Sequence, residues 1–160
     1  MKKVEVHQYC VQFVEERIDR LDKMKNSAQQ AANDDTKSSA GDKYETNREM
    51  MQAEKDKAMQ QLSEALKLRK VLDGINIKNN SDEISLGSLV QTNIGLFYIA
   101  VAIGEFEIDK TKVFGISPVS PIGNALKGYK KGDIINFNGR EVSVELVCWF
   151  VTKFLSCIIC

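Results

Sequence analysis

Two carboxylates three residues apart, Asp42 and Glu45, are spaced for metal chemistry. Residues at positions i and i+3 of a helix share a face, so both side chains can approach one cation. Mg²⁺ accepts one or two protein carboxylates while keeping several waters, and two such ions about 4 Å apart promote phosphodiester hydrolysis. Asp42 and Glu45 can supply part of such a site, and a partner must supply the remaining ligands.

The same pair also fits a capping box, in which the first side chain accepts from the backbone three positions on and the Glu reaches back. A cap can still present a carboxylate oxygen outward, so the spacing leaves both interpretations open. Asp34 and Asp35 match no ligand spacing, and we expect them to be solvated. Lys37, Lys43 and Arg48 can screen phosphates near the pair or simply solubilise a helix.

The histidine and the cysteines indicate packing rather than catalysis. His7 falls on the apolar stripe of a predicted helix and has no second His or Cys at ligand spacing. Residues 148–160 form a largely apolar tail that contains Cys148, Cys157 and Cys160. Cys157 and Cys160 match a CxxC pair and a C-terminal prenylation motif, but no second pair exists for zinc. An extra strand or helix, a partner-binding segment and an aggregating extension all remain open for this tail.

Composition excludes several classes of protein. The 160 residues carry 22 basic and 22 acidic side chains, so the formal net charge is zero. This balance argues against a strongly basic nucleic-acid binder and against an acidic disordered chain. No apolar run is long enough to span a bilayer, and the charged residues after Met1 do not resemble a signal peptide. We expect a soluble, cytoplasmic protein with reduced thiols.

The carboxylate pair lies between two predicted helices. Residues 4–32 lack Gly and Pro, and apolar residues recur there at spacings of three, four and seven: Val4, Val11, Val14, Ile18, Leu21, Ala28 and Ala32. Residues 33–41 are turn-forming and predict a loop. A second helix is predicted over residues 44–73, with an apolar stripe of Met51, Ala58, Leu62, Ala65 and Leu72 before Gly74. Residues 1–75 should therefore form an antiparallel two-helix coiled-coil hairpin, an arm.

The second half of the chain predicts a small α+β domain. Residues 76–82 form a polar linker, and short β-forming runs follow over residues 83–147. Asn138-Gly139 between apolar strands signals a type I′ hairpin. Ser120 can cap a short helix that begins at Pro121 and closes at Gly128. The expected fold class is α+β, an antiparallel sheet with one short helix.

Two segments resemble a known family. Gly41-Asp42-Lys43-Tyr44-Glu45 resembles the G-D-x-x-E hairpin tip of the bacterial Gre-type transcript cleavage factors. Residues 116–133, ISPVSPIGNALKGYKKGD, resemble the I-S-x-x-S-P-I-x-x-A-L-x-G-x-x-x-G-D signature of that family. The resemblance covers roughly residues 3–145 and implies an FKBP-like carboxyl-terminal domain.

The resemblance also implies a function. In that family the arm enters the secondary channel of RNA polymerase, and tip carboxylates, here Asp42 and Glu45, assist hydrolysis of backtracked RNA. Pro118, Ser120 and Pro121 would then contact the polymerase, since two prolines preset a surface at low ordering cost. The chain would be an accessory factor rather than an enzyme. It would have no cofactor of its own, would share Mg²⁺ with the polymerase active site, and would reach the RNA 3′ end through the polymerase. We expect a monomer that binds no membrane.

Two alternatives remain. Thr46, Asn47 and Val119 replace residues usual in the family, which favours a regulator that occupies the polymerase channel without stimulating cleavage. An FKBP-like prolyl isomerase or chaperone is the other alternative. It requires an aromatic-lined pocket for proline, whereas the aromatic residues here fall at strand positions typical of a core.

Overall fold

The structure, a computed structural model, describes residues 2–35, 42–78 and 81–148, and it leaves the side chains of residues 32, 34, 35, 42–48 and 148 undescribed. Two compact units divide the chain. The arm unit is Val11–Lys70, and the described part of the sheet unit comprises residues 2–10 together with residues 71–78 and 81–148. The elements in chain order are α1 (Lys3–Asp35), α2 (Asp42–Asp73), β1 (Leu89–Thr92), β2 (Gly95–Ile99), β3 (Gly104–Ile108), β4 (Thr111–Ile116), α3 (Pro121–Leu126), β5 (Ile134–Phe137) and β6 (Arg140–Cys148).

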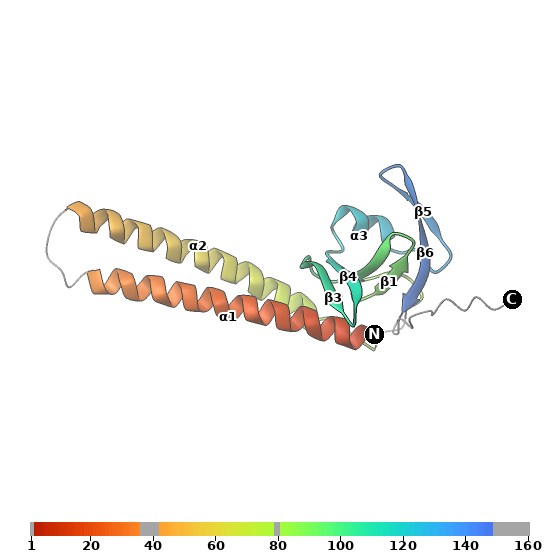
Figure 1. The fold of residues 1–160 in the computed structure, drawn as a ribbon, viewed down its shortest axis with the longest axis horizontal. Helices are drawn as coiled ribbons and strands as arrows, with labels where there is room; N and C mark the ends of the chain where they lie inside the picture. The colour runs from red at the N-terminus through yellow and green to blue at the C-terminus, as the bar shows by residue number, and fades with distance from the viewer. Residues whose placement is uncertain (1, 36–41, 79–80, 149–160) are drawn as a thin grey trace. The chain divides into compact units, whose positions relative to one another are not determined.

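Both long helices predicted from the sequence are present (Figure 1). They have 33 and 32 residues, so each is about 50 Å long at a rise of about 1.5 Å per residue. The loop expected from Asn33 was placed too early, because α1 continues to Asp35. The Gln29 side chain donates to Asn33 Oδ1 over 3.0 Å, an i, i+4 contact that supports this last turn.

Within the arm unit the helices run antiparallel, as predicted. Glu15, early in α1, pairs with Arg69, late in α2, over 3.0 Å, while Met24 and Met51 line one hollow further along. The stripe predicted on each helix is confirmed, with Val14, Leu21, Ala58 and Ala65 buried and Val11, Ile18, Met51 and Leu62 half-buried. A narrow seam of this kind is typical of coiled coils.

The first turns of α1 depart from the predicted stripe. Val4, placed on the apolar seam by its spacing, is 43% exposed, whereas Val6, His7 and Cys10 are buried. These residues belong to the sheet unit, where His7 bonds to Tyr98 of β2. The buried face of α1 therefore differs in this stretch, because here the helix packs against strands of the sheet through His7 with Tyr98 and Tyr9 with Phe106.

The sheet has six strands in the order β3-β4-β2-β1-β6-β5. Four pairings are antiparallel as expected, but β2 and β4 pair in parallel. Parallel neighbours usually need a long crossover. Here β3 serves as the crossover. After β2 the chain forms β3 at the edge of the sheet and returns through a tight hairpin as β4, which lies between β3 and β2.

Two hairpin turns use positive backbone angles. Asn138 and Gly139 have φ of 52° and 75°, which confirms the predicted type I′ signal between β5 and β6. Asp109 and Lys110 also have positive φ, 49° and 60°, in the turn between β3 and β4. Neither of these two is glycine, so residue types signal this second hairpin less strongly.

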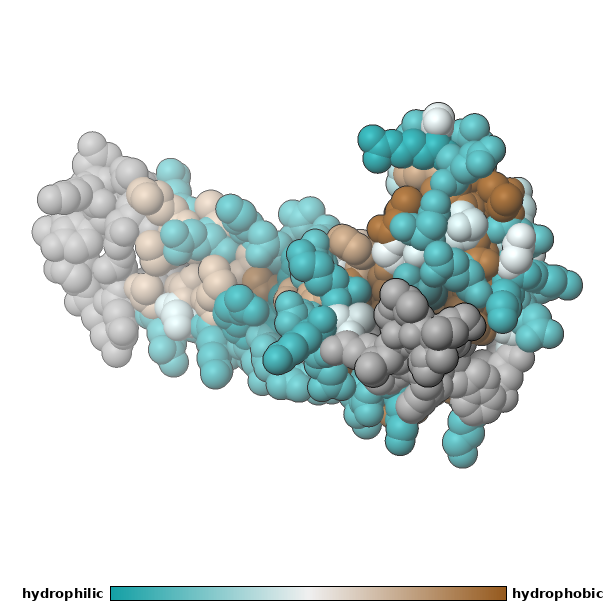
Figure 2. Space-filling model, turned by 45° about the vertical axis from the view of Figure 1, so that its right-hand side comes forward, coloured by the Kyte–Doolittle hydropathy of each residue, from teal (hydrophilic) through white to brown (hydrophobic). Residues whose placement is uncertain are grey.

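The core of the sheet unit lies between α3 and the strands (Figure 1). Its buried members are Ile84, Val90, Phe97, Ile99, Leu126, Ile135, Val142 and Val144. Ile84 precedes β1, whose strand begins at Leu89, later than the apolar run around Ile84 suggested. Figure 2 shows the strongly hydrophobic side chains on the sheet unit and paler ones along the visible face of the arm.

Candidate functional site

The predicted tip residues fall at the start of α2. This helix begins at Asp42, two residues earlier than expected, so Asp42 and Glu45 occupy its first and fourth positions. Positions three apart share a helix face. Their side chains, and those of Asp34, Asp35, Lys37, Lys43 and Arg48, lie outside the described residues. The choice between a capping box and a metal-assisting pair therefore stays a prediction.

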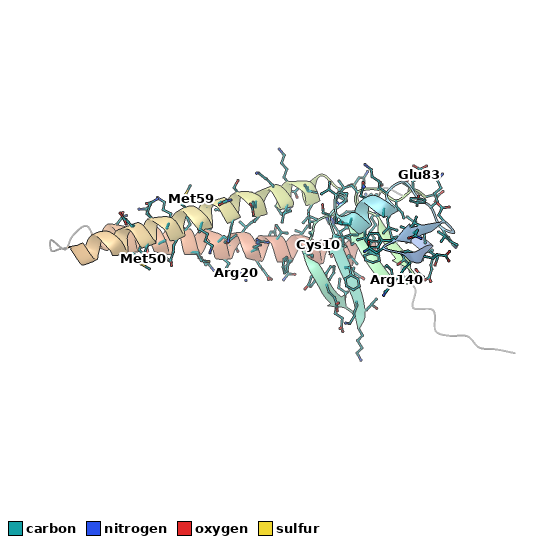
Figure 3. The ribbon with its side chains drawn as sticks, turned by 90° about the horizontal axis from the view of Figure 1, so that it is seen from above. Cys10, Arg20, Met50, Met59, Glu83 and Arg140 are labelled. Carbon is teal, nitrogen blue, oxygen red and sulfur yellow. The ribbon has the colours of Figure 1, made fainter. Side chains whose placement is uncertain are left out.

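Behind this end, the arm contains an open hollow of about 510 Å³. Its lining combines small and flexible apolar side chains, Ala28, Ala31, Met24 and Met51, with the charged residues Arg20, Lys23 and Glu54. Met24 is 55% exposed, and Met50 and Met59 are exposed on α2, where Figure 3 labels them. Exposed methionines adapt to irregular surfaces, so this stretch of the arm suits contact with a partner.

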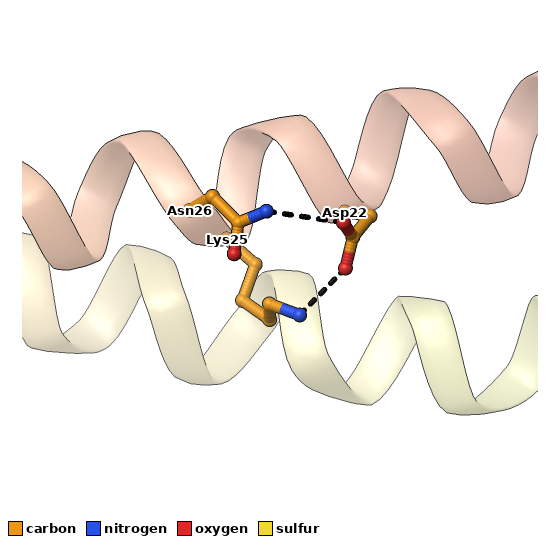
Figure 4. Close-up of polar contacts among 3 residues, drawn as sticks. All are labelled: Asp22, Lys25 and Asn26. Atoms are coloured by element: carbon orange, nitrogen blue, oxygen red, sulfur yellow. Dashed lines mark hydrogen bonds and ion pairs between the residues drawn. The ribbon is translucent and has the colours of Figure 1, made fainter.

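Charges beside the hollow differ in how they are compensated. Asp22 accepts from Lys25 Nζ over 2.5 Å and from Asn26 over 3.0 Å (Figure 4). The hydrogen bond from Lys25 is the main reason that the pKa of Asp22 lies below its usual value. Among the described residues, Arg20 and Lys23 have no ion pair. These two cations are therefore available to an acidic or phosphate-bearing partner.

The predicted docking residues form a tight turn at the start of α3. Ser120 is the N-cap, and its hydroxyl accepts from Gly123 N over 3.2 Å and donates to Ser117 O over 2.6 Å. Pro121 follows at the first helical position and is exposed, while Pro118 and Ser120 are half-buried. Val119 is 86% exposed. Val119 and Pro121 are therefore exposed to solvent, whereas the Ser120 side chain hydrogen-bonds within the turn and stabilises it.

Gly123 explains why this turn can be so tight. A Cβ at Gly123 would lie 2.2 Å from Ser117 O, a distance that no side chain can occupy. The backbone of α3 therefore approaches residues 117 and 118 more closely than any other residue type would allow. Gly123 falls at an unspecified position of the signature that residues 116–133 resemble, so the sequence alone did not reveal its steric role.

A buried polar cluster joins the start of α1 to β2. His7, predicted to pack, is buried, and its Nδ1 lies 2.7 Å from the Tyr98 hydroxyl. Cys10 is buried beside them, and burial raises the pKa of its thiol to about 12. Burial, with Cys10 as a second cause, raises the pKa of Tyr98 as well. The raised pKa values keep both groups neutral, so this cluster stabilises the unit and supplies no nucleophile.

Other classes of site find no support in the described part of the chain. No group of three His, Cys, Asp or Glu side chains there is arranged to hold a metal ion. No helix of the described ranges is long and apolar enough to cross a membrane. The cysteines of the tail, Cys157 and Cys160, lie outside the described residues.

Comparisons with known proteins show structural similarity without a sequence match. No protein-family model and no curated protein sequence matches the chain. Among solved structures, the chain is similar to the GreA factor homolog 1 (Gfh1) protein of Thermus thermophilus, with 18% identity and a TM-score of 0.36. The match covers 86% of this chain and 94% of that one. A similarity at this level assigns no residue a role.

Proposed function

We propose that this chain is a transcription elongation factor that binds RNA polymerase, inserts the arm tip into the secondary channel and stimulates cleavage of backtracked RNA. One observation carries the proposal: two antiparallel helices of about 50 Å are joined by residues 36–41, immediately before the acidic start of α2. Such an arm can bring carboxylates into a narrow, distant site. The resemblance of residues 41–45 and 116–133 to the Gre-type segments supports the same function.

Asp42 and Glu45 are the proposed metal-assisting residues. Their positions on one face at the start of α2 suit two ligands of a shared ion, and the polymerase would supply the rest. When bound, Mg²⁺ would polarise the phosphodiester and lower the pKa of the attacking water. The chain itself contributes negative charge at the tip, held at the end of a stiff helix pair.

The turn before α3 is the proposed docking surface. Val119 and Pro121 are exposed on a segment whose backbone is fixed by Ser120 and by the close approach at Gly123. A surface ordered in advance loses little conformational entropy when a partner binds. In this arrangement Pro118 and Ser120 position the turn, while Val119 and Pro121 contact the polymerase.

The decisive experiment adds the full chain to a stalled, backtracked elongation complex and follows the length of the RNA. Stimulated shortening is expected. Asp42→Asn and Glu45→Gln preserve capping ability but remove charge, so each should lower stimulated cleavage at least about tenfold, equivalent to ~1.4 kcal/mol. Polymerase binding and the unfolding midpoint should change little.

Asp56→Asn is the matched control for the tip. Asp56 is exposed on α2 and accepts from Gln52 over 2.9 Å, so Asp56→Asn removes the same charge away from the tip. This variant should cleave like the parent. If the two tip variants also cleave like the parent, the carboxylates act only as a cap.

Docking is tested separately with Val119→Arg. Because Val119 is 86% exposed, the change should weaken polymerase binding while leaving the unfolding midpoint nearly unchanged. Ser120→Ala removes the cap and should instead lower the free energy of unfolding by about 0.5–2 kcal/mol. If Val119→Arg binds polymerase as tightly as the parent, the turn before α3 is not the docking surface.

A second candidate is a regulator that occupies the polymerase channel and does not stimulate cleavage. It is favoured by Val119, an apolar and highly exposed residue where the family often has an acid. The same experiment distinguishes the two, because this candidate predicts polymerase binding and inhibition with no RNA shortening.

A further inference from the structure

The segment between α3 and β5 displays three lysines around one tyrosine. We call residues 127–132, Lys-Gly-Tyr-Lys-Lys-Gly, the lysine loop. All six residues are exposed, and none of them is acidic. Within a chain of zero net charge, this is a local concentration of positive charge beside an aromatic ring.

Backbone hydrogen bonds fix the lysine loop at both ends. Gly128 N donates to Ile84 O over 2.9 Å, and Ile84 N donates to Tyr129 O over the same distance. At the other end, Gly132 N donates to Val144 O over 2.8 Å. Between them, Lys130 N donates to Asp133 Oδ2 over 2.7 Å. The loop therefore has a defined shape before any ligand binds, which lowers the entropy lost on binding.

The two glycines of the loop serve its conformation. Gly128 and Gly132 have φ of 82° and 92°, where a side chain would be strained. A Cβ at either position would nevertheless meet no atom within 4 Å. Open space therefore lies beside both glycines, and a ligand can approach the loop there.

The charged side chains of the loop are unequally compensated. Lys130 Nζ pairs with Glu83 over 3.1 Å, and Figure 3 marks Glu83 on the sheet unit. Among the described residues, Lys127 and Lys131 have no ion pair. Tyr129, between them, is 41% exposed, so its ring is partly held by packing and partly open. Two uncompensated cations thus flank one partly exposed aromatic ring.

We propose that the lysine loop binds single-stranded nucleic acid, with Lys127 and Lys131 contacting phosphates and Tyr129 stacking on a base. Single-stranded binders combine positive charge along the backbone with aromatic rings on which bases stack. An acidic protein surface could pair with the lysines, but it would supply no base to stack on the ring. This inference is independent of the tip and of the docking turn.

The test measures binding of the full chain to a fluorescent single-stranded RNA of about 20 nucleotides at low salt. Lys127→Glu with Lys131→Glu should weaken binding at least about tenfold. Each phosphate contact contributes ~0.7 to the logarithmic salt dependence, so losing two contacts should reduce that slope by about 1.4. Tyr129→Ala should weaken binding at least about fivefold, while Tyr129→Phe, which keeps the ring, should bind within about twofold of the parent.

Lys78→Glu with Lys110→Glu is the matched control. Both residues are exposed in the sheet unit and lie outside the loop, so the pair makes the same change in net charge. It should weaken RNA binding less than about twofold. Unfolding midpoints verify that each variant folds, and Lys127→Gln with Lys131→Gln replaces the Glu pair if that variant unfolds.

Three results would overturn the proposal. The first is no RNA binding by the parent chain at low salt, and the second is a control pair that weakens binding as much as the loop pair does. The loop pair could also weaken polymerase binding while RNA binding persists, which would assign the loop to an acidic protein surface. This test measures RNA binding and not RNA cleavage, so its result does not depend on the result of the tip experiment.

Discussion

The arm unit and the sheet unit are stabilised in different ways. Among the described residues, the buried apolar side chains of the arm unit are Val14, Leu21, Ala28, Ala58 and Ala65, three of them alanine. The sheet unit buries much larger groups, including Tyr98, Phe97 and Leu72. Burial of apolar area is the main favourable term in folding, so the sheet unit gains far more from packing. The arm depends more on helix propensity and on contacts between successive turns.

Polar contacts show the same difference. In the arm they are exposed or half-buried, and most join residues three or four apart, as in Asp22 with Lys25 and Gln52 with Asp56. The Glu15–Arg69 pair, which joins the two helices, is also exposed. In the sheet unit the His7–Tyr98 bond is buried and joins residues 91 positions apart. Exposed contacts are screened by water and are individually weak, whereas a buried one is costly to break. Substitutions on the surface of the arm should therefore cost little stability, whereas substitutions inside the sheet unit should cost much more.

The largest effect is expected from truncating one phenylalanine in the sheet unit. Phe97 is 7% exposed and packs against Phe114 with ring centroids 5.5 Å apart, so Phe97→Ala leaves a cavity. The free energy of unfolding should fall by about 3–5 kcal/mol in urea titrations followed by circular dichroism. Phe13→Ala in the arm, where Phe13 is 36% exposed, should cost less than about 1 kcal/mol. Equal costs would contradict the difference between the units.

Tyr98→Phe tests how much the buried polar contact in the sheet unit contributes to stability. It removes the hydroxyl that lies 2.7 Å from His7 Nδ1 while keeping the ring, and should cost about 1–3 kcal/mol. Tyr129→Phe, at an exposed position, should leave the unfolding midpoint almost unchanged. The same urea titrations measure both variants, and a negligible cost for Tyr98→Phe would show that the buried bond adds no net stability.

Alkaline pH should weaken the sheet unit through Cys10. Folding raises the pKa of Cys10 from 9.0 to about 12, so its contribution is complete below pH 9 and is lost as the pH rises toward 12. Between pH 8 and pH 10 the loss attributable to the thiol should approach ~1.4 kcal/mol, the value of one pKa unit. Urea titrations at both pH values should show a smaller loss in Cys10→Ala. Tyr98 and Lys3 titrate in both proteins, so the difference between the two reports Cys10 together with its effect on the pKa of Tyr98.

The smallest effect belongs to the ion pair between the two arm helices. Glu15 and Arg69 are separated by 3.0 Å, and the Glu15 side chain is 53% exposed. Glu15→Gln should lower stability by less than about 1 kcal/mol, and adding salt should reduce the difference from the parent. Thermal melts at low and high ionic strength measure this. If Glu15→Gln lowers stability as much at high salt as at low salt, salt does not screen this ion pair.

Local patterns predicted most of the elements. Heptad-like spacing located both long helices, and Asn138-Gly139 located a hairpin whose two positive φ angles are confirmed. The cap at Ser120 and the proline at the first position of α3 also follow from residue types alone. These features depend on neighbours within a few residues, which is the range over which a sequence can be interpreted directly.

Contacts between distant residues could not be predicted in this way. The spacing placed Val4 on the apolar stripe, yet Val6 is buried there instead because β2 lies against this part of α1. The parallel pairing of β2 with β4 depends on where the intervening hairpin inserts, and no local pattern specifies that position. The steric role of Gly123 likewise depends on how closely the backbone passes Ser117 O.

The sequence by itself determined the order of two long helices followed by a strand-rich domain, and it identified Asp42, Glu45 and residues 116–133 as the segments that suggest a function. Only the tertiary structure decided that His7 and Cys10 serve the sheet unit, that Ser120 faces inward while Val119 faces outward, and that the lysine loop is rigid and open. Helix periodicity and capping arise from short-range backbone geometry, which the residue types encode. Burial and pairing between distant segments arise from packing, which depends on the whole fold at once.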